Sequence, residues 1–190
     1  MAEAMAHWLK RSLQEPKRIH LWGNHDLAYA FPNNRHLRCS GFTEEKCAII
    51  RNILTAEDWS RLRLLHHEAP NFIFTHAGID PKIFEHPIAG LTVDRMKTRC
   101  DEALANAQAG LRDPVLDLSG VTWLRWWEME HLEHFHQIVG HTPDPNIQVS
   151  KGETSFNVCL DTFGNYVGML TDGHFTYLDT RNGREVQVNN

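Results

Sequence analysis

The chain has 190 residues, which is enough for one domain with a hydrophobic core. Hydrophobic residues make up 42% and charged residues 23%, a composition that excludes a disordered or fibrous protein. The net charge of −5 argues against binding to nucleic acid or to an anionic membrane, and no apolar run is long enough to cross a bilayer. The four cysteines show no CxxC spacing, which predicts reduced thiols in a cytoplasmic protein.

Helical and strand-like patterns alternate through the first three quarters of the chain. An opening amphipathic helix is expected to end before Pro16, and Lys17–Trp22 is expected to form a short strand. Thr43 and Thr55 each precede acidic residues and an apolar periodic segment, which predicts two further helices capped by these side chains.

Two more buried strands are predicted at Phe72–Thr75 and Gln137–Gly140, separated by a long helix between Val93 and Leu111. The pattern then changes to strand-like segments divided by Gly, Asn and Asp turns. These segments are Phe156–Asp161, Tyr166–Leu170, Phe175–Leu178 and Glu185–Val188. The sequence therefore predicts an α/β fold with mixed sheets, outer helices and a late antiparallel meander, in a single domain spanning residues 1–190.

Three of the predicted strands end in a loop that carries Asn or His. The loops contain Gly-Asn24-His-Asp, Thr-His76-Ala-Gly and Gly-His141-Thr. Ligands bind beyond the carboxyl ends of strands in open α/β sheets, so we expect these loops to converge on one site. One amide oxygen and two imidazole nitrogens form a mixed donor set that suits manganese, iron or zinc. Each residue alone is better explained as an ordinary polar loop residue, but the repeated context favours a shared site.

The ordered segments Gly23–Asp26, Thr75–Gly78 and Gly140–Thr142 resemble the motifs of the calcineurin-like metallophosphatases. This superfamily includes the serine/threonine protein phosphatases and the diadenosine-tetraphosphatase-like enzymes. The resemblance covers essentially the whole chain. It implies a two-sheet mixed β-sandwich flanked by helices, and a site with two divalent metals, manganese being favoured over iron or zinc. The implied reaction is hydrolysis of P–O bonds by metal-activated water.

The resemblance also implies roles for individual residues. Asn24, His76 and His141 would be protein ligands of the second metal, and His25 would be the general acid that protonates the leaving oxygen. Arg125 lies where relatives keep a phosphate-binding arginine, although a surface arginine beside tryptophans explains it equally well. The substrate would be a phosphorylated protein, a nucleotide or another small phosphoester. Its specificity is expected to reside in the loops that span residues 28–42 and 80–91.

Two earlier motifs of the family, D-x-H and G-D-x-x-D, are not found before Gly23. They would supply every protein ligand of the first metal. We therefore favour the C-terminal portion of an enzyme that lacks its first strands, and we expect the exposed sheet edge to promote self-association. The alternative is a shortened, non-catalytic module of this fold that binds a partner or a single metal.

Overall fold

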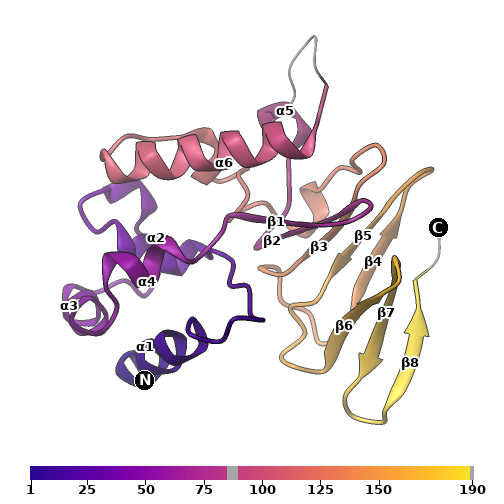
Figure 1. Ribbon diagram of the computed structural model, residues 1–190, viewed down its shortest axis with the longest axis horizontal. Helices are drawn as coiled ribbons and strands as arrows, with labels where there is room; N and C mark the ends of the chain where they lie inside the picture. Colours follow the sequence, from indigo (N-terminus) through magenta and orange to yellow (C-terminus); the bar gives the residue numbers. More distant parts are fainter. Residues whose placement is uncertain (85–89, 189–190) are drawn as a thin grey trace.

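The computed structural model describes residues 1–84 and 90–188. Its helices gather on one side of the molecule and its strands on the other (Figure 1). The α-helices of the described chain are α1 (Ala2–Ser12), α2 (Asn24–Ala30), α3 (Glu44–Ile53), α4 (Ala56–Ser60), α5 (Pro81–Phe84) and α6 (Val93–Gln108). Short 3₁₀ helices lie at η1 (Arg35–Leu37), η2 (Pro114–Leu116) and η3 (Trp126–Glu128). Within those two stretches, no helix combines the length and apolar character that crossing a membrane requires.

The predicted helix caps are confirmed. The Thr43 hydroxyl accepts a hydrogen bond from the Lys46 amide at 3.1 Å, and Thr55 forms a reciprocal capping box with Asp58. The long helix α6 buries a stripe through Met96 and Cys100. It ends at Gln108, before Leu111, which is therefore left exposed.

The predicted strand at Lys17–Trp22 is almost absent. It is reduced to one parallel bridge between Leu21 and Arg63, in which the Trp22 amide donates to the Arg63 carbonyl at 2.9 Å. A strand needs a continuous partner, and in the described part of the chain this segment pairs only around Arg63.

The first sheet is mixed. Its strands are β1 (Leu65–Glu68), β2 (Phe72–Thr75), β3 (His136–Val139), β4 (Gln148–Lys151) and β5 (Phe156–Cys159), in the order β1-β2-β3-β5-β4. The central strands β2, β3 and β5 run parallel, and the edge strands β1 and β4 run antiparallel to their neighbours. The carboxyl ends of β2 and β3 therefore meet at the same edge of the sheet.

The second sheet is an antiparallel meander of β6 (Tyr166–Thr171), β7 (His174–Asp179) and β8 (Arg184–Gln187). Phe175 of this sheet belongs to the same buried cluster as Phe72, Phe156 and Val158 of the first sheet. The α/β class, the mixed sheet and the late meander are thus confirmed. The prediction that Phe156–Asp161 belongs to the meander is wrong, because Val158 pairs in parallel with Ile138 of β3.

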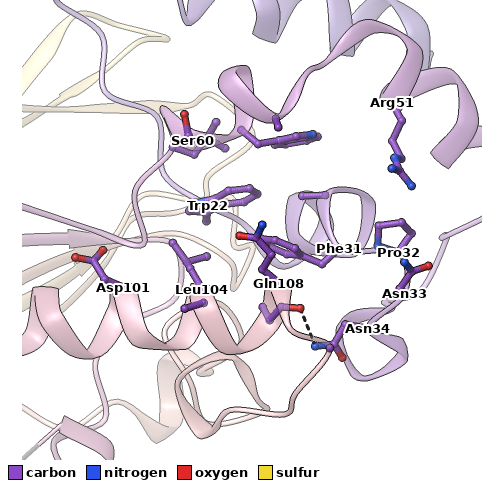
Figure 2. A pocket seen from close by; sticks show the side chains of 17 residues that line it. Trp22, Phe31, Pro32, Asn33, Asn34, Arg51, Ser60, Asp101, Leu104 and Gln108 are labelled. Atoms are coloured by element: carbon purple, nitrogen blue, oxygen red, sulfur yellow. Dashed lines mark hydrogen bonds between the residues drawn. The ribbon is translucent and has the colours of Figure 1, made fainter.

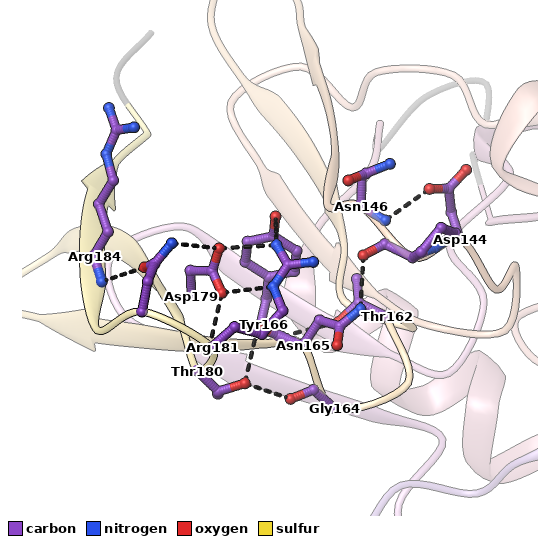
Figure 3. A network of polar contacts seen from close by, with 12 residues as sticks. Asp144, Asn146, Thr162, Gly164, Asn165, Tyr166, Asp179, Thr180, Arg181 and Arg184 are labelled. Carbon is purple, nitrogen blue, oxygen red and sulfur yellow. Dashed lines mark hydrogen bonds and ion pairs between the residues drawn. The ribbon is translucent and has the colours of Figure 1, made fainter.

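An ion-pair network holds the turn between β7 and β8 (Figure 3). The Arg181 guanidinium donates to both carboxylate oxygens of Asp179 at 2.8 Å and to the Tyr166 hydroxyl of β6 at 2.6 Å. Hydrogen bonding by Arg181 lowers the pKa of Asp179 to about 2. The network therefore ties all three strands of the second sheet together at one end.

This network should make stability depend on pH. Because the folded-state pKa of Asp179 is lowered, its contribution is complete above the ordinary Asp pKa of about 3.9 and is lost as the pH falls toward about 2. We expect Asp179→Asn to be less stable than the wild type at pH 7, and the difference to shrink between pH values of about 4 and about 2. Urea unfolding at several pH values measures this. Asp172→Asn, in the exposed β6–β7 turn, is the control, and a pH-independent difference for Asp179→Asn would contradict the prediction.

Candidate functional site

Two of the predicted site residues leave the same edge of the first sheet. His76 follows the last residue of β2, and His141 follows β3 after a single glycine. The Gly140 amide donates to the His76 carbonyl at 2.9 Å, so the two loops remain hydrogen-bonded beyond the ends of their strands. Asn24, the first residue of α2, is buried and reaches the same place from the helical side.

The side chains of these residues are in direct contact. His76 Nε2 lies 3.2 Å from Asn24 Oδ1 and 3.1 Å from His141 Nδ1. Residues separated by 52 and 65 positions therefore meet around one imidazole. We call Asn24, His76 and His141 the histidine cluster. Gly23 leaves room for it, since a Cβ there would lie 3.2 Å from His76 Cε1.

Burial makes both imidazoles poor bases. It lowers the pKa of His76 to about 4, with a further contribution from the neighbouring His141. It also lowers the pKa of His141 to about 4, with the nearby Arg125 guanidinium acting in the same direction. At pH 7 both rings are therefore neutral, and each offers one N–H donor and one nitrogen acceptor.

His141 carries two unfavourable features. Its backbone φ is 68°, in the left-handed region that costs a non-glycine residue of order 1–3 kcal/mol. Its Nε2 atom is buried and has no hydrogen-bond partner in residues 1–84 and 90–188, which adds a desolvation cost. Strained residues with unpaired polar atoms concentrate at functional sites, and both features here fall on a residue of the histidine cluster.

Arg125 is held close to this cluster by its neighbours. The Ala77 amide donates to the Val121 carbonyl at 2.9 Å, and the Trp126 amide donates to the Thr142 hydroxyl at 3.1 Å. The chain from Val121 to Trp126 is thereby tied to the loops after β2 and β3. The Arg125 side chain is half-exposed, and its charge acts on His141.

His25 is the second residue of α2 and is exposed. A positive charge on His25 lowers the pKa of both His76 and His141, which places it near the cluster. Its Nδ1 atom lies 3.2 Å from the Sγ atom of Cys39. Sequence reasoning missed this contact, because no motif connects a loop cysteine with a residue 14 positions earlier. Cys39 lies in the first expected specificity loop, and residues 85–89 of the second lie outside the described residues.

The expected divalent metal is not supported. Within the described ranges no group of three or more His, Cys, Asp or Glu side chains could hold a metal ion. The cluster contributes two imidazoles and an amide but no carboxylate. A manganese, iron or zinc cofactor is therefore an incorrect expectation, whereas the assignment of Asn24, His76 and His141 to a functional site stays a prediction. The three side chains do come together.

Two cavities flank α2. One, of about 560 Å³, lies at the far end of the helix from His25 and is lined by Trp22, Phe31 and Trp59, with Arg51 and Asp101 at its rim (Figure 2). No residue of the histidine cluster lines it. The other, of about 520 Å³, lies between α1, α2 and α3 and includes His25 and Asp26 in its wall. The histidine cluster is thus defined by its side-chain contacts, and its three residues line neither of these two cavities.

No family model matches the chain, and no curated protein matches it. Solved structures with a similar fold do exist. A cold-active protein-tyrosine phosphatase of a psychrophile, a Shewanella species, aligns at 16% identity with a TM-score of 0.58, over 90% of this chain and 58% of that one. A mutant of a cold-active protein tyrosine phosphatase aligns at 16% identity with a TM-score of 0.62, over 99% of this chain and 64% of that one. The chain therefore spans less than two thirds of the length of these structures.

These comparisons contradict the resemblance drawn from the motifs. The similar structures are named protein-tyrosine phosphatases, not calcineurin-like metallophosphatases, and no family model supports the latter assignment. We therefore withdraw the expected family and, with it, hydrolysis by metal-activated water. At 16% identity the likeness establishes the fold alone.

The neutral state of the cluster can be tested directly. We expect His76 and His141 to titrate near pH 4, well below an ordinary histidine at about 6.5. Removing the neighbouring cation in Arg125→Gln should raise the pKa of His141 and leave that of His76 nearly unchanged. Residue-resolved NMR titration of the imidazole signals measures both values. Ordinary titration of His76 and His141 near pH 6.5 in the wild type would contradict this account of the site.

Proposed function

We propose that the protein is a phosphoester hydrolase, a phosphatase that acts on a phosphorylated protein or a small phosphoester. The observation that carries this proposal is the meeting of Asn24, His76 and His141 beyond the carboxyl ends of β2 and β3, with Arg125 and His25 close by. The likeness in fold to solved structures that are named phosphatases supports it.

Arg125 supplies the phosphate contact in this proposal. A guanidinium presents parallel N–H donors that match two phosphate oxygens. The side chain is half-exposed, so it can meet a ligand from solution. Its backbone is fixed through the hydrogen bonds of Ala77 and Trp126, and the bound phosphoryl group would therefore lie beside His141.

His25 supplies the proton that the departing oxygen needs. Phosphoryl transfer depends on positioning and charge stabilisation, and an alkoxide leaving group departs more easily when a side chain protonates it. His25 is the exposed imidazole next to the cluster, whereas His76 and His141 are neutral at pH 7, and a neutral imidazole is too weak an acid to protonate the leaving oxygen. We therefore assign general-acid catalysis to His25.

His76 and His141 orient the attacking water in this scheme. A neutral imidazole can accept a hydrogen bond from water without being protonated. The Asn24 side chain contacts His76 Nε2 at 3.2 Å and restrains the orientation of that ring. The two rings then contribute by holding the attacking water in place, and phosphoryl transfer depends strongly on such positioning.

The proposal also covers the domain organisation, the location and the self-association of the protein. We treat residues 1–190 as a single domain in which the two sheets form a sandwich, supported by the cluster that Phe175 shares with Phe72 and Phe156. A cytoplasmic location and self-association through an exposed sheet edge remain predictions. The chain spans only part of the length of its structural neighbours. Phosphatase activity is therefore a proposal for this chain.

The proposal is tested by removing the central imidazole. We expect the wild type to hydrolyse p-nitrophenyl phosphate and His76→Ala to lower kcat at least about 100-fold, because the water and its neighbours lose their orientation. Steady-state kinetics measures the loss, and circular dichroism checks that the variant is folded. His174→Ala, an exposed histidine of β7, is the control. Full activity in folded His76→Ala would show that the site is misassigned.

Arg125 gives a separate prediction about binding. Arg125→Gln should raise KM for a phosphomonoester about tenfold or more, since a bidentate contact to the phosphate is lost. The matched control is Arg184→Gln, on an exposed position of β8, which should change neither KM nor kcat. An unchanged KM in Arg125→Gln would remove Arg125 from the site.

A further inference from the structure

A groove lies along α6, apart from the histidine cluster. It consists of two hollows, of about 560 Å³ and about 440 Å³, that both lie against this helix. The two hollows share the lining residues Ser60, Leu62, Asp101 and Leu104, so they adjoin one another. No residue of the histidine cluster lines either of them. We call the larger one the aromatic hollow and the smaller one the cationic hollow.

The aromatic hollow is walled by three rings (Figure 2). The Trp22 and Trp59 rings stack with centroids 5.3 Å apart, and the Phe31 ring lies against Trp22 with centroids 5.8 Å apart. Trp22 is almost fully buried, whereas Trp59 and Phe31 are only partly buried. Their ring surface can therefore meet a ligand, and aromatic side chains of this kind stack well on flat rings such as nucleobases.

The cationic hollow is lined by two cations from different elements. Arg63 lies shortly before β1 and Lys97 lies in α6, and both side chains are exposed. Within residues 1–84 and 90–188 neither of them forms an ion pair. Two like charges that line one hollow repel each other. A phosphate group would relieve this repulsion, since it is an anion whose oxygens accept hydrogen bonds from both side chains.

The helix α6 fixes the order of the groups along the groove. Lys97 lines only the cationic hollow, Asp101 lines both hollows, and Gln108 lines only the aromatic hollow. Because a helix rises about 1.5 Å per residue, Asp101 lies about 6 Å along the axis from Lys97, and Gln108 lies about 10 Å further. The groove therefore presents a cation, a carboxylate and an aromatic surface in sequence. A nucleotide presents a phosphate, the ribose hydroxyls and a flat base in the same sequence, and a carboxylate is a common partner of ribose hydroxyls.

We propose that the groove along α6 is a binding site for a nucleoside monophosphate. The base lies against Trp59 and Phe31 in the aromatic hollow. Asp101 accepts hydrogen bonds from the ribose hydroxyls where the two hollows adjoin. Arg63 and Lys97 bind the phosphate in the cationic hollow. The proposal does not depend on phosphoester hydrolysis at the histidine cluster.

Arg51 also lines the aromatic hollow, but it is the weaker candidate for the phosphate. It is a single cation, and it lies on the opposite side of Trp22 from Asp101 (Figure 2). A phosphate bound by Arg51 would therefore draw the ribose away from the carboxylate.

Fragments of the ligand test the proposal on the wild-type protein. Isothermal titration calorimetry measures the Kd for AMP, adenosine, ribose 5-phosphate and GMP. We expect adenosine and ribose 5-phosphate to bind at least about tenfold more weakly than AMP, because each lacks one end of the nucleotide. GMP should bind within about threefold of AMP, since stacking on aromatic side chains tolerates different bases. Absence of AMP binding at millimolar concentration, or ribose 5-phosphate binding as tightly as AMP, overturns the proposal.

Charge variants locate the phosphate. Arg63→Gln and Lys97→Gln should each raise the Kd for AMP about tenfold or more, whereas Arg51→Gln should change it by less than about twofold. The matched control is Lys151→Gln, an exposed lysine of β4 that lines neither hollow. A loss of affinity in Arg51→Gln with none in Lys97→Gln contradicts the proposed orientation and overturns the assignment.

The ribose contact is tested with Asp101→Asn. This change also removes a negative charge near the phosphate, so the readout is the ratio of the affinity for AMP to that for 2′,3′-dideoxy-AMP, in which the charge effect cancels. The ratio should fall at least about fivefold relative to the wild type. Asp94→Asn, in the first turn of the same helix, is the control. An unchanged ratio in Asp101→Asn would remove the carboxylate from the site and overturn the proposal.

The variant His76→Ala separates this groove from the histidine cluster. It should bind AMP with the wild-type Kd, because His76 lines neither hollow. Loss of AMP binding in folded His76→Ala would place the nucleotide at the histidine cluster and overturn the proposal. If the wild type hydrolyses no phosphoester, only the proposed function fails, and the Kd values for AMP and its fragments still decide the nucleotide site.

Discussion

The parallel pairing of β2 with β3 is the constraint on which the site depends. Phe74 lies opposite Ile138 in the register, so both strands end at the same level and His76 and His141 leave the sheet together. The Gly140 amide extends the pairing by one hydrogen bond to the His76 carbonyl. A shift of one residue in this register would turn the side chains of one strand to the opposite face and separate the two imidazoles.

The histidine cluster lowers the stability of the folded chain in two ways, through burial of polar groups and through backbone strain. Burial of the two imidazoles lowers the pKa of His76 and of His141 to about 4, and the Nε2 atom of His141 is left without a partner in the described chain. The left-handed backbone of His141 adds strain. The surrounding core, with Phe72, Ile73 and Val158 almost fully buried, supplies the apolar burial that offsets such costs.

The motifs predicted a convergence of side chains that the structure contains and a metal chemistry that the comparisons contradict. Three short segments in a fixed order predicted a convergence at strand ends, and the histidine cluster lies there. Short motifs do not specify which groups complete a site, since that depends on neighbours far away in sequence. Arg125 acts on His141 because two hydrogen bonds tie its segment to the loops after β2 and β3, and the Cys39 sulfur meets His25 across 14 positions of the chain. The position of Arg125 was expected from the resemblance, but neither its effect on His141 nor the contact of Cys39 with His25 has a local sequence signal.

The sequence alone determined the elements that local interactions specify. The caps at Thr43 and Thr55, the apolar stripe of α6 and the turns of the late meander follow from residues within a few positions of one another. Only the tertiary structure decided the pairing: it added β1 and β4, moved Phe156–Cys159 into the first sheet and reduced the strand before Gly23 to a single bridge. The physical reason is that a helix satisfies its own backbone hydrogen bonds, whereas a strand exists only where a partner completes it.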